Sequence, residues 1–535
     1  GPPDERFARF GYADDSDNPR RPLPLGLGWT TGTKGSLGQV TLTCGACHIG
    51  YVRTTDGTVQ RLVGAPNTRV DARRWRHAFE LAALNVKSGG VSRAATRLRQ
   101  ILAAKPPNYF YDGCTSSGEP LDAAQEFVER KIVNDEAEAI LQSFVDRTLT
   151  GREAINKQKE TSYAASNSPP LDGGTPGQSD GSGDLIPKLL LLDWFEQKCP
   201  KNAGGDCVDR ALAEFRLHEF PELPQGRATA THILSTWRQV DHSLAQIDGS
   251  VKSPFFRNIA ASLAVAGDPR SVNYENAERC ARFLTRLPPP AYPFAVNLRV
   301  AERGRAIFQK NCAVCHRARN EIIYRAAPLD SRTGAVIAGI ETDPNRAAVL
   351  NESAVRLMVQ HFRKSVPDDF DTLDSNGHKV KAALLPDEQI VIDRSKPENQ
   401  GYVADALDGI WARGPYLHGG SVPTLYHLLK PAERPATFVR GSISYDENNV
   451  GWKWKLTDIE SIRTDDPQAV LFHAAWDGAK KGGHDRNLTV DAAGHILRTD
   501  WSATDAADAI KVRLDWSDPE YQQPLMELLE YLKTL

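Results

Sequence analysis

The chain lacks the features that mark membrane-spanning and nucleic-acid-binding proteins. No apolar run approaches the roughly eighteen residues that a transmembrane helix needs, and the strongest candidate, Leu189–Leu192, ends at Asp193. No charge of one sign dominates, because 65 lysines and arginines stand against 68 aspartates and glutamates, for a net charge of −3. We therefore predict no membrane span and no nucleic-acid partner.

The composition is otherwise that of a folded globular protein. Hydrophobic residues make up 40% of the chain and charged residues 25%, which is ordinary for a soluble protein and excludes a disordered one. The 535 residues are enough for two large domains or several smaller ones. The first residues, Gly1–Glu5, are polar and do not form a signal peptide, so either none existed or this is the mature chain.

Cysteine is scarce, yet one cysteine pattern occurs twice. Four of the eight cysteines lie in C-x-x-C-H motifs, Cys44-Gly45-Ala46-Cys47-His48 and Cys312-Ala313-Val314-Cys315-His316. Two thiols at this spacing can form thioether bonds to the two vinyl groups of one haem, and the following imidazole then ligates the iron. The sequence therefore predicts two covalently bound haem c groups.

The residues assigned to each haem follow from the motif. We expect Cys44, Cys47, Cys312 and Cys315 to carry the thioether bonds, and His48 and His316 to be the proximal iron ligands. Three other interpretations fit less well. A zinc site usually has its two C-x-x-C pairs close together, a dithiol redox motif needs no histidine, and ordinary disulfide or core cysteines would not repeat the pattern.

The remaining cysteines bear on the compartment. Covalent haem attachment takes place outside the cytoplasm, so we expect a periplasmic or secreted protein. Cys199 and Cys207 bracket a short polar loop and are candidates for a disulfide, which leaves Cys114 and Cys280 as a second possible pair. The alternative is that these four cysteines are buried free thiols.

The repeated motif predicts a duplicated organisation. Apolar residues recur at helical spacing from Val300 to Asn311, just before the second motif, and a leucine stripe from Leu525 to Leu535 ends the chain. A similar stripe of Cys280, Phe283, Leu284 and Leu287 stops at three prolines, Pro288–Pro290. We predict a mainly α fold of two cytochrome-c-like haem domains with long loop insertions, an N-terminal domain at residues 1–290 and a C-terminal domain at 291–535. Residues 161–184 are expected to form a mobile surface loop.

The second axial ligand of each iron decides the chemistry. Methionine is limited to Met358 and Met526, both better explained as core residues. Histidines are better candidates for the second axial ligand, but their spacing in the sequence does not indicate which of them ligates an iron. His77 follows the first motif in an arginine-rich stretch, Arg73–His77, which indicates propionate pairing or a solvated helix face rather than iron ligation.

Three further segments carry a family resemblance. They are GIWARGPYLHGGSVPTLYHLL at 409–429, RPATFVRGSISYDENNVGW at 434–452, and the G-x-x-x-F-x-x-x-C-x-x-C-H run at Gly304–His316. Together they resemble the di-haem cytochrome c peroxidase superfamily, and within it the branch of the bacterial rubber oxygenase and the periplasmic fatty-acid dioxygenases. The resemblance is clear over about 301–450 and weaker over 25–64 and 231–290, and the residues do not support it through 90–230.

The resemblance implies roles for particular residues. One haem of such proteins relays electrons, while the N-terminal haem binds dioxygen. The C-terminal haem has a second histidine in a Gly-His pair, which places His484 first as distal ligand and His418 second. The family also carries an aromatic residue between or beside the haems, for which Trp237 is the candidate, and some relatives hold a calcium ion between the domains. A core tryptophan is the alternative for Trp237.

Two function classes follow. The first is an enzyme that activates dioxygen or hydrogen peroxide at one haem and relays electrons through the other, acting on a small-molecule or hydrophobic substrate, with a redox partner protein as possible electron donor. The second is a non-catalytic di-haem electron-transfer cytochrome c. The length of the chain favours the enzyme, because a carrier rarely needs 535 residues for two haems.

Overall fold

The computed structural model describes most of the chain. The described residues are 7–12, 24–30, 39–104, 130–146, 148–149, 152, 176–179, 181–199, 207, 210–211, 213–215, 231–239, 245–266, 272–316, 340, 342–349, 352–374, 377–391, 401–476 and 478–535.

Helices carry more of the described chain than strands do, as predicted for a mainly α protein. They are α2 (Cys44–His48), α3 (Ala72–Gly89), α4 (Val91–Ala104), α6 (Gly181–Lys198), α8 (Pro254–Ala266), α9 (Tyr274–Arg286), α10 (Leu298–Asn311), α11 (Asn345–Val349), α12 (Glu352–Ser365), α13 (Asp387–Ile390), α14 (Leu425–Leu429), α15 (Ile459–Asp465) and α16 (Gln522–Leu532). Short 3₁₀ turns lie at Ala382–Leu384, Ile410–Ala412, Pro431–Glu433, Leu456–Asp458 and Pro519–Tyr521.

The strands form small antiparallel sheets. The two-stranded pairs are β1 (Leu27–Thr30) with β2 (Gln39–Leu42), β3 (Ile49–Arg53) with β4 (Val59–Val63), β5 (Gln178–Ser179) with β6 (Thr231–His232), β7 (Asp371–Leu373) with β8 (Lys379–Lys381), β9 (Thr437–Arg440) with β12 (Val470–His473), and β10 (Tyr445–Asp446) with β11 (Gly451–Trp452). A three-stranded sheet has the order β14 (Ile496–Arg498), β13 (Leu488–Val490), β15 (Ile510–Val512). No described sheet is large enough to form a core alone.

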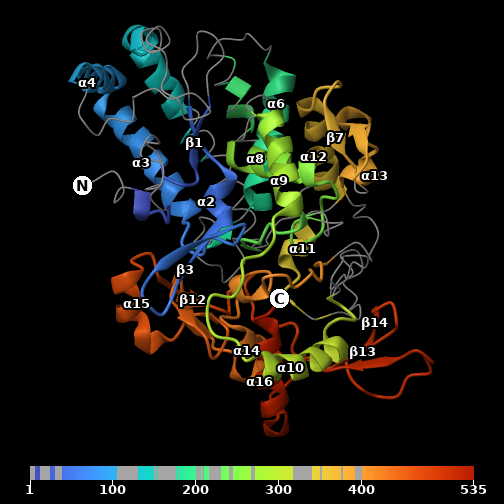
Figure 1. Cartoon of the computed structure of the whole chain (residues 1–535). Helices are drawn as coiled ribbons and strands as arrows, with labels where there is room; N and C mark the ends of the chain where they lie inside the picture. The colour runs from blue at the N-terminus through green and yellow to red at the C-terminus, as the bar shows by residue number, and fades with distance from the viewer. Residues whose placement is uncertain are drawn as a thin grey trace.

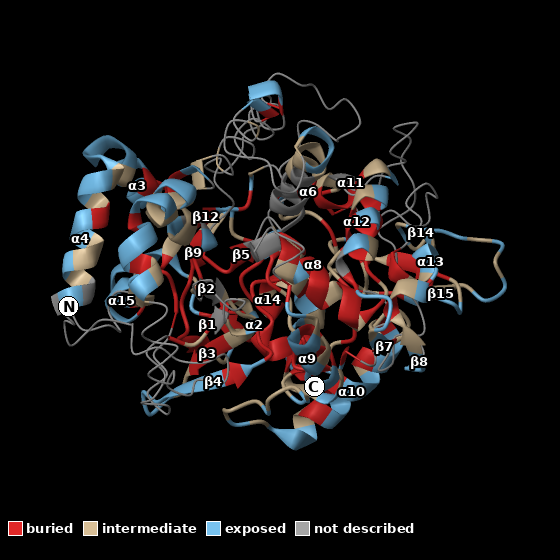
Figure 2. Cartoon of the chain, turned by 90° about the horizontal axis from the view of Figure 1, so that it is seen from above, coloured by how far each residue is buried: buried red, intermediate tan, exposed pale blue. Residues whose placement is uncertain are grey.

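One core lies among helices α6, α8, α9 and α12, which Figure 1 shows grouped together. Its buried residues include Phe255, Phe256 and Ile259 of α8 and Phe362 of α12. Residues before and after Pro288 therefore share this core. Figure 2 shows buried residues gathered in the middle of the molecule, among α8, α14 and β3, with exposed residues on outlying elements such as α4.

A second core also joins the two halves of the chain. It combines Val52 and Trp237 with Trp411, Trp452 and the leucines of α16. Burial of large aromatic side chains contributes strongly to stability, on the order of 2–3 kcal/mol for each. The division of the chain at residue 290 stays a prediction.

Helices α10 and α16 pack against each other, as Figure 1 shows. Asn297 caps α10 by accepting a hydrogen bond from the Val300 amide at 3.2 Å. The predicted leucine stripe is confirmed for Leu525, Leu528, Leu529 and Leu532, which are all buried in α16. Its last residue, Leu535, follows the end of the helix and is half-buried. The predicted helix before the second motif is confirmed as well, because α10 ends at Asn311 and leads directly into Cys312.

The stripe predicted for α9 is wrong in part. Leu284 is buried, but Phe283 is 57% exposed, and the buried face is instead made by Ala277, Ala281 and Leu284. Large apolar residues on a helix surface are common, so the spacing of Phe283 did not fix its direction.

The expected loop at 161–184 is also wrong at its C-terminal end. Gln178 is buried in strand β5, and helix α6 begins at Gly181. The pairing that orders this segment, Gln178 with His232, comes from a strand 54 positions away, which local composition does not reveal. Residues 161–175 lie outside the described part of the chain.

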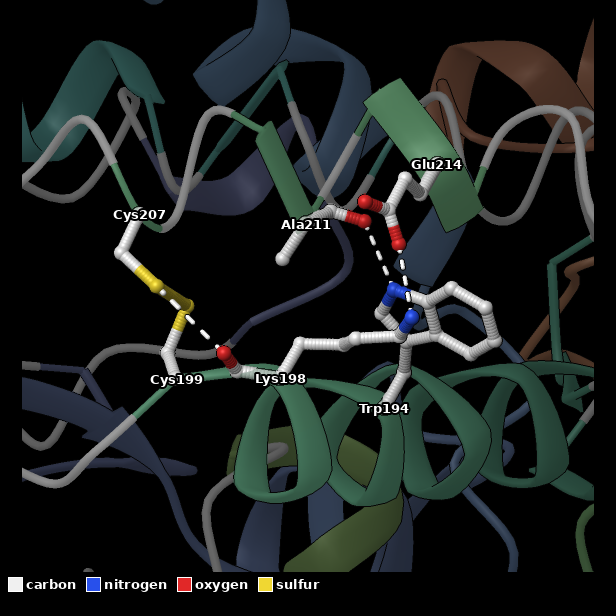
Figure 3. Close-up of a disulfide and its surroundings, with 6 residues drawn as sticks. All are labelled: Trp194, Lys198, Cys199, Cys207, Ala211 and Glu214. Carbon is white, nitrogen blue, oxygen red and sulfur yellow. Dashed lines mark hydrogen bonds and ion pairs between the residues drawn. A yellow bond between two sulfur atoms is a disulfide. The ribbon is translucent and has the colours of Figure 1, made fainter.

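The expected disulfide between Cys199 and Cys207 is present. Figure 3 shows it at the end of α6, where Lys198 forms an ion pair with Glu214 at 2.8 Å. Cys114 lies outside the described residues, so its pairing with Cys280 stays a prediction. None of the described helices is long and apolar enough to cross a membrane.

Candidate haem sites

The first C-x-x-C-H motif forms the short helix α2, between strands β2 and β3. The His48 Nδ1 atom lies 2.9 Å from the Leu234 carbonyl oxygen, to which it donates. This bond leaves the Nε2 lone pair of His48 free for a metal, as is usual for metal-binding histidines. Burial lowers the pKa of His48 to about 4, so the imidazole is neutral at physiological pH.

The second motif repeats this arrangement. Its backbone turns tightly after α10, with the Cys312 amide donating to Phe308 at 2.7 Å and the His316 amide donating to Cys312 at 2.8 Å. The His316 Nδ1 atom lies 2.7 Å from the Asp405 carbonyl oxygen. Both motif histidines are thus oriented by a backbone carbonyl from a distant segment, and burial lowers the pKa of His316 as well.

The ring of His484 faces that of His316. Their centroids are 6.5 Å apart, with an angle of 45° between the ring planes. Metal–imidazole bonds of roughly 2 Å would place the centroids of two rings on opposite sides of one metal about 6 Å apart. The His484 Nδ1 atom is buried and has no hydrogen-bond partner among the described residues. These observations fit a haem iron between His316 and His484.

The loop that carries His484 is held in an unusual conformation. His484 has φ +59° and Gly483 has φ +102°, and a Cβ at Gly483 would lie 2.5 Å from Thr342 Cβ, so only glycine fits there. Arg434 donates to the carbonyl oxygens of Gly483 at 2.9 Å and His484 at 3.2 Å. Arg434 is thus a positioning residue for His484.

His418 lies beside this loop rather than opposite His316. Its ring stacks on Tyr402 with centroids 4.4 Å apart, and its Nδ1 is 3.4 Å from Thr342 Oγ1. Its Nε2 has no hydrogen-bond partner within the described ranges. Burial lowers the pKa of His418 to about 4. The structure therefore brings both histidine candidates to the region of the second motif, with Thr342 between them.

Trp237 lies between the scaffolds of the two motifs. Its indole Nε1 donates to the Val63 carbonyl at 2.8 Å. A Cβ at Gly64 would meet Nε1 at 2.6 Å, and a Cβ at Gly409 would meet Cζ3 at 2.5 Å. The Gly64 amide donates to the carbonyl of His48, and Gly409 lies four residues after Asp405, whose carbonyl accepts from His316. The indole therefore contacts a segment next to each motif histidine.

Two other predictions concern the first site. His77 is on the exposed side of α3 and lies 3.6 Å from Glu80, which confirms the solvated helix face. Cys280 lies on α9 with its thiol next to that of Cys44, and this contact raises the pKa of Cys44; its possible pairing with Cys114 stays a prediction. No group of three or more metal-binding side chains that could hold an ion such as calcium occurs in the part of the chain that the structure describes.

Several residues of the sites were missed in the sequence. Leu234 and Asp405 act through backbone carbonyls, which any residue supplies, so no signal marks them. Arg413 and Arg434 lie inside the segments that carry the family resemblance, and buried arginines in such segments could have been selected as candidates.

Comparison with known proteins gives two kinds of match. A family model described as "RoxA-like, cytochrome c-like" matches residues 401–439, which include Asp405, Arg413, His418 and Arg434. The protein of Sinorhizobium fredii (strain NBRC 101917 / NGR234) titled "Uncharacterized protein y4iM" is 41% identical over 451 residues, which cover 83% of this chain and 98% of that protein. The chain belongs to the y4iM family.

A second relative of this y4iM-family chain comes from the same organism. The "Uncharacterized protein y4iJ" is 29% identical over 202 residues, covering 32% of this chain and 33% of that protein. The RoxA-like match supports the relationship to rubber-oxygenase-like cytochromes, and a cytochrome c-like domain suggests covalently bound haem c. The match spans 39 residues and does not include either C-x-x-C-H motif.

Proposed function

We propose that the chain is a periplasmic or secreted di-haem c-type oxidoreductase that activates dioxygen or hydrogen peroxide at the first site and relays electrons through the second. The observation that carries this proposal is the pair of imidazoles at the second motif, where the ring centroids of His316 and His484 are 6.5 Å apart. The resemblance of the sequence implies that the first motif holds the site that binds the oxidant.

Each site has its own residues for binding a haem and for orienting the iron ligand. When bound, haem c supplies the redox chemistry and the binding of the oxidant. Cys44, Cys47 and His48 would hold the group at which the oxidant binds. The bonds from Nδ1 of both motif histidines to carbonyls fix the tautomer in which Nε2 can ligate.

At the second site, Cys312, Cys315 and His316 would hold the other group, and His484 would supply a second imidazole to it. Trp237 lies between the two scaffolds, where an indole can support electron transfer or exclude water. His418 is buried and neutral beside the His484 loop, where it shapes the polarity of this pocket. The substrate is a small or hydrophobic molecule, and a redox partner protein supplies the electrons.

An electron carrier is the second candidate, favoured by the pairing of His316 with His484, which suits a closed redox centre. Two closed, low-spin haems would make the protein a carrier. One closed and one open haem would make it an enzyme.

The test uses protein from a host competent in cytochrome maturation. Intact mass should show two haems added to the chain. Absorption and EPR spectra, before and after reduction and with carbon monoxide, should show one high-spin haem that binds carbon monoxide and one low-spin haem. A mass equal to the bare chain rejects the proposal altogether, and two inert low-spin haems reject the enzyme.

Paired variants assign the two signals. Replacing both cysteines of the first motif by serine should remove one haem and the carbon monoxide signal. The matched replacement in the second motif should remove one haem and leave that signal in place. If the first-motif variant keeps the carbon monoxide signal and the second-motif variant loses it, the open site lies at the second motif and the proposed assignment is wrong.

A further inference from the structure

Arg413 is a buried arginine next to the second motif, and some of its N–H groups have no hydrogen-bond acceptor among the described residues. Arg413 Nη1 donates to the Asp405 carboxylate at 3.2 Å and to the Ala406 carbonyl at 2.8 Å. Its Nε and Nη2 atoms are buried and have no hydrogen-bond partner among the described residues. Its guanidinium is also 5.7 Å from the centre of a Trp237 ring. Arg413 thus has two buried nitrogen donors for which the described part of the chain provides no acceptor.

A second arginine occupies the corresponding place at the first motif. Arg257 lies on α8, which contacts strand β2 just before Cys44. Its Nη2 donates to Gln239, while its Nε is buried without a partner in the described ranges. Gln239, which accepts this bond, lies five residues after Leu234, whose carbonyl oxygen accepts from His48. Arg257 is therefore held by the segment that orients His48, as Arg413 is held by Asp405, which orients His316.

The Asp405 carboxylate contacts Arg413, and its charge acts on Arg257 as well. Asp405 pairs with Arg413 at 3.2 Å, and it opposes the lowering of the Arg257 pKa that burial causes. The Asp408 carboxylate also acts on Arg413, but it is paired with Arg238 at 2.9 Å. Nε and Nη2 of Arg413 and Nε of Arg257 therefore stay without a partner among the described residues. Burying a charge or a donor without a partner is unfavourable, because the group loses its hydrogen bonds to water. This cost would be removed by a bound anion with planar oxygen pairs, which is the acceptor that a guanidinium matches best.

We propose that Arg257 and Arg413 bind the propionate carboxylates of the two haems, Arg257 at the first site and Arg413 at the second. This assignment rests on the proposed di-haem function. Asp405 links the parts of the second site, because its carbonyl orients His316 and its carboxylate holds Arg413. The propionate-binding side of both sites then faces the region of Trp237.

The proposal predicts separate effects on the two reduction potentials. A buried positive charge beside a haem favours its reduced form, which carries one positive charge less. Replacing Arg413 by glutamine should lower the potential of the second haem, and replacing Arg257 by glutamine should lower that of the first. We expect at least a tenfold change in the reduced-to-oxidised ratio at fixed potential, equivalent to about 59 mV for one electron.

The experiment uses the haem-loaded protein and measures both potentials by spectroelectrochemistry in Arg413→Gln, Arg257→Gln and the control Arg238→Gln. Arg238 is adjacent to Trp237 and carries the same charge, but it is 47% exposed and pairs with Asp408 at 2.9 Å. The control should change neither ratio more than twofold, because solvent screens its charge. Site-specific lowering supports the proposal. Unchanged potentials in both variants, or equal shifts in the control, overturn it.

A second readout covers the case in which a glutamine variant does not fold. Arg413→Lys keeps the charge but loses the planar fork. Its resonance Raman spectrum should show altered propionate bending bands for the second haem alone, and unchanged bands overturn the proposal. Haem content by intact mass is measured first on the unaltered protein. A missing haem there refutes the proposed function, whereas two haems with insensitive potentials refute only the arginine assignment.

Discussion

The contact between α10 and α16 depends on the absence of a side chain at residue 304. A Cβ there would lie 1.9 Å from the Glu527 carbonyl oxygen and 2.5 Å from the carbonyl carbon. Because nonbonded atoms prefer about 3.5 Å or more, Gly304→Ala would force the two helix backbones apart by roughly 1.5 Å. Neither atom belongs to a flexible side chain that could turn away.

Two opposing terms set the size of the effect. Overpacking costs about 1–3 kcal/mol, and a clash between backbones falls at the upper end of that range. Alanine gains up to about 1 kcal/mol over glycine in a helix. The expected net loss is about 2 kcal/mol, which raises the open population of this helix pair about 30-fold. Since α10 leads directly into Cys312, the second haem site should loosen with it.

Hydrogen exchange measured by mass spectrometry tests this expectation on peptides spanning α10 and α16. Gly304→Ala should exchange about 30-fold faster than the unaltered chain in both helices. Gly89→Ala is the matched control, because a Cβ at Gly89 meets nothing within 4 Å. Slow exchange in α10 and α16 of Gly304→Ala would refute the close contact between the helices.

Three further predictions concern other parts of the chain. His484→Ala should convert a low-spin haem to a high-spin one in the EPR spectrum, and an unchanged spectrum would reject His484 as a ligand. Burial lowers the pKa of His427 to about 4, so the unfolded chain binds a proton more readily than the folded chain does. The free energy of unfolding therefore keeps the whole contribution of this histidine above pH 6.5 and loses it as the pH falls towards 4. Between pH 7 and pH 5 this loss should be about 2 kcal/mol, and urea unfolding of His427→Gln should show a loss smaller by that amount. Replacing Cys199 and Cys207 by serine should cost roughly 2–3 kcal/mol in urea unfolding; equal stability would show that the disulfide adds nothing.

The sequence was most informative where short-range spacing determines structure. The leucine stripe of α16 and the helix before Cys312 follow from helical periodicity, and the bond between Cys199 and Cys207 follows from their short separation. These features depend on local geometry, so they could be predicted before any tertiary contact was known.

The parts of the sites that could not be predicted depend on distant segments. The carbonyls of Leu234 and Asp405 reach the motif histidines from elsewhere in the chain, and carbonyls leave no trace in the sequence. The approach of His484 to His316 requires a loop with positive φ held by Arg434. The resemblance pointed to His484, but the spacing of residues alone did not select it.

The cores shared across Pro288 have a consequence for how the two candidate redox centres behave. Cutting the chain there would leave Phe255 and Ile259 without the α12 side chains that cover them, and Trp237 without Trp411. Neither fragment would keep its apolar surface away from water, so the halves would not survive as separate modules. Because the described cores join the two halves, we expect the separation of the two C-x-x-C-H motifs to be set when the chain folds.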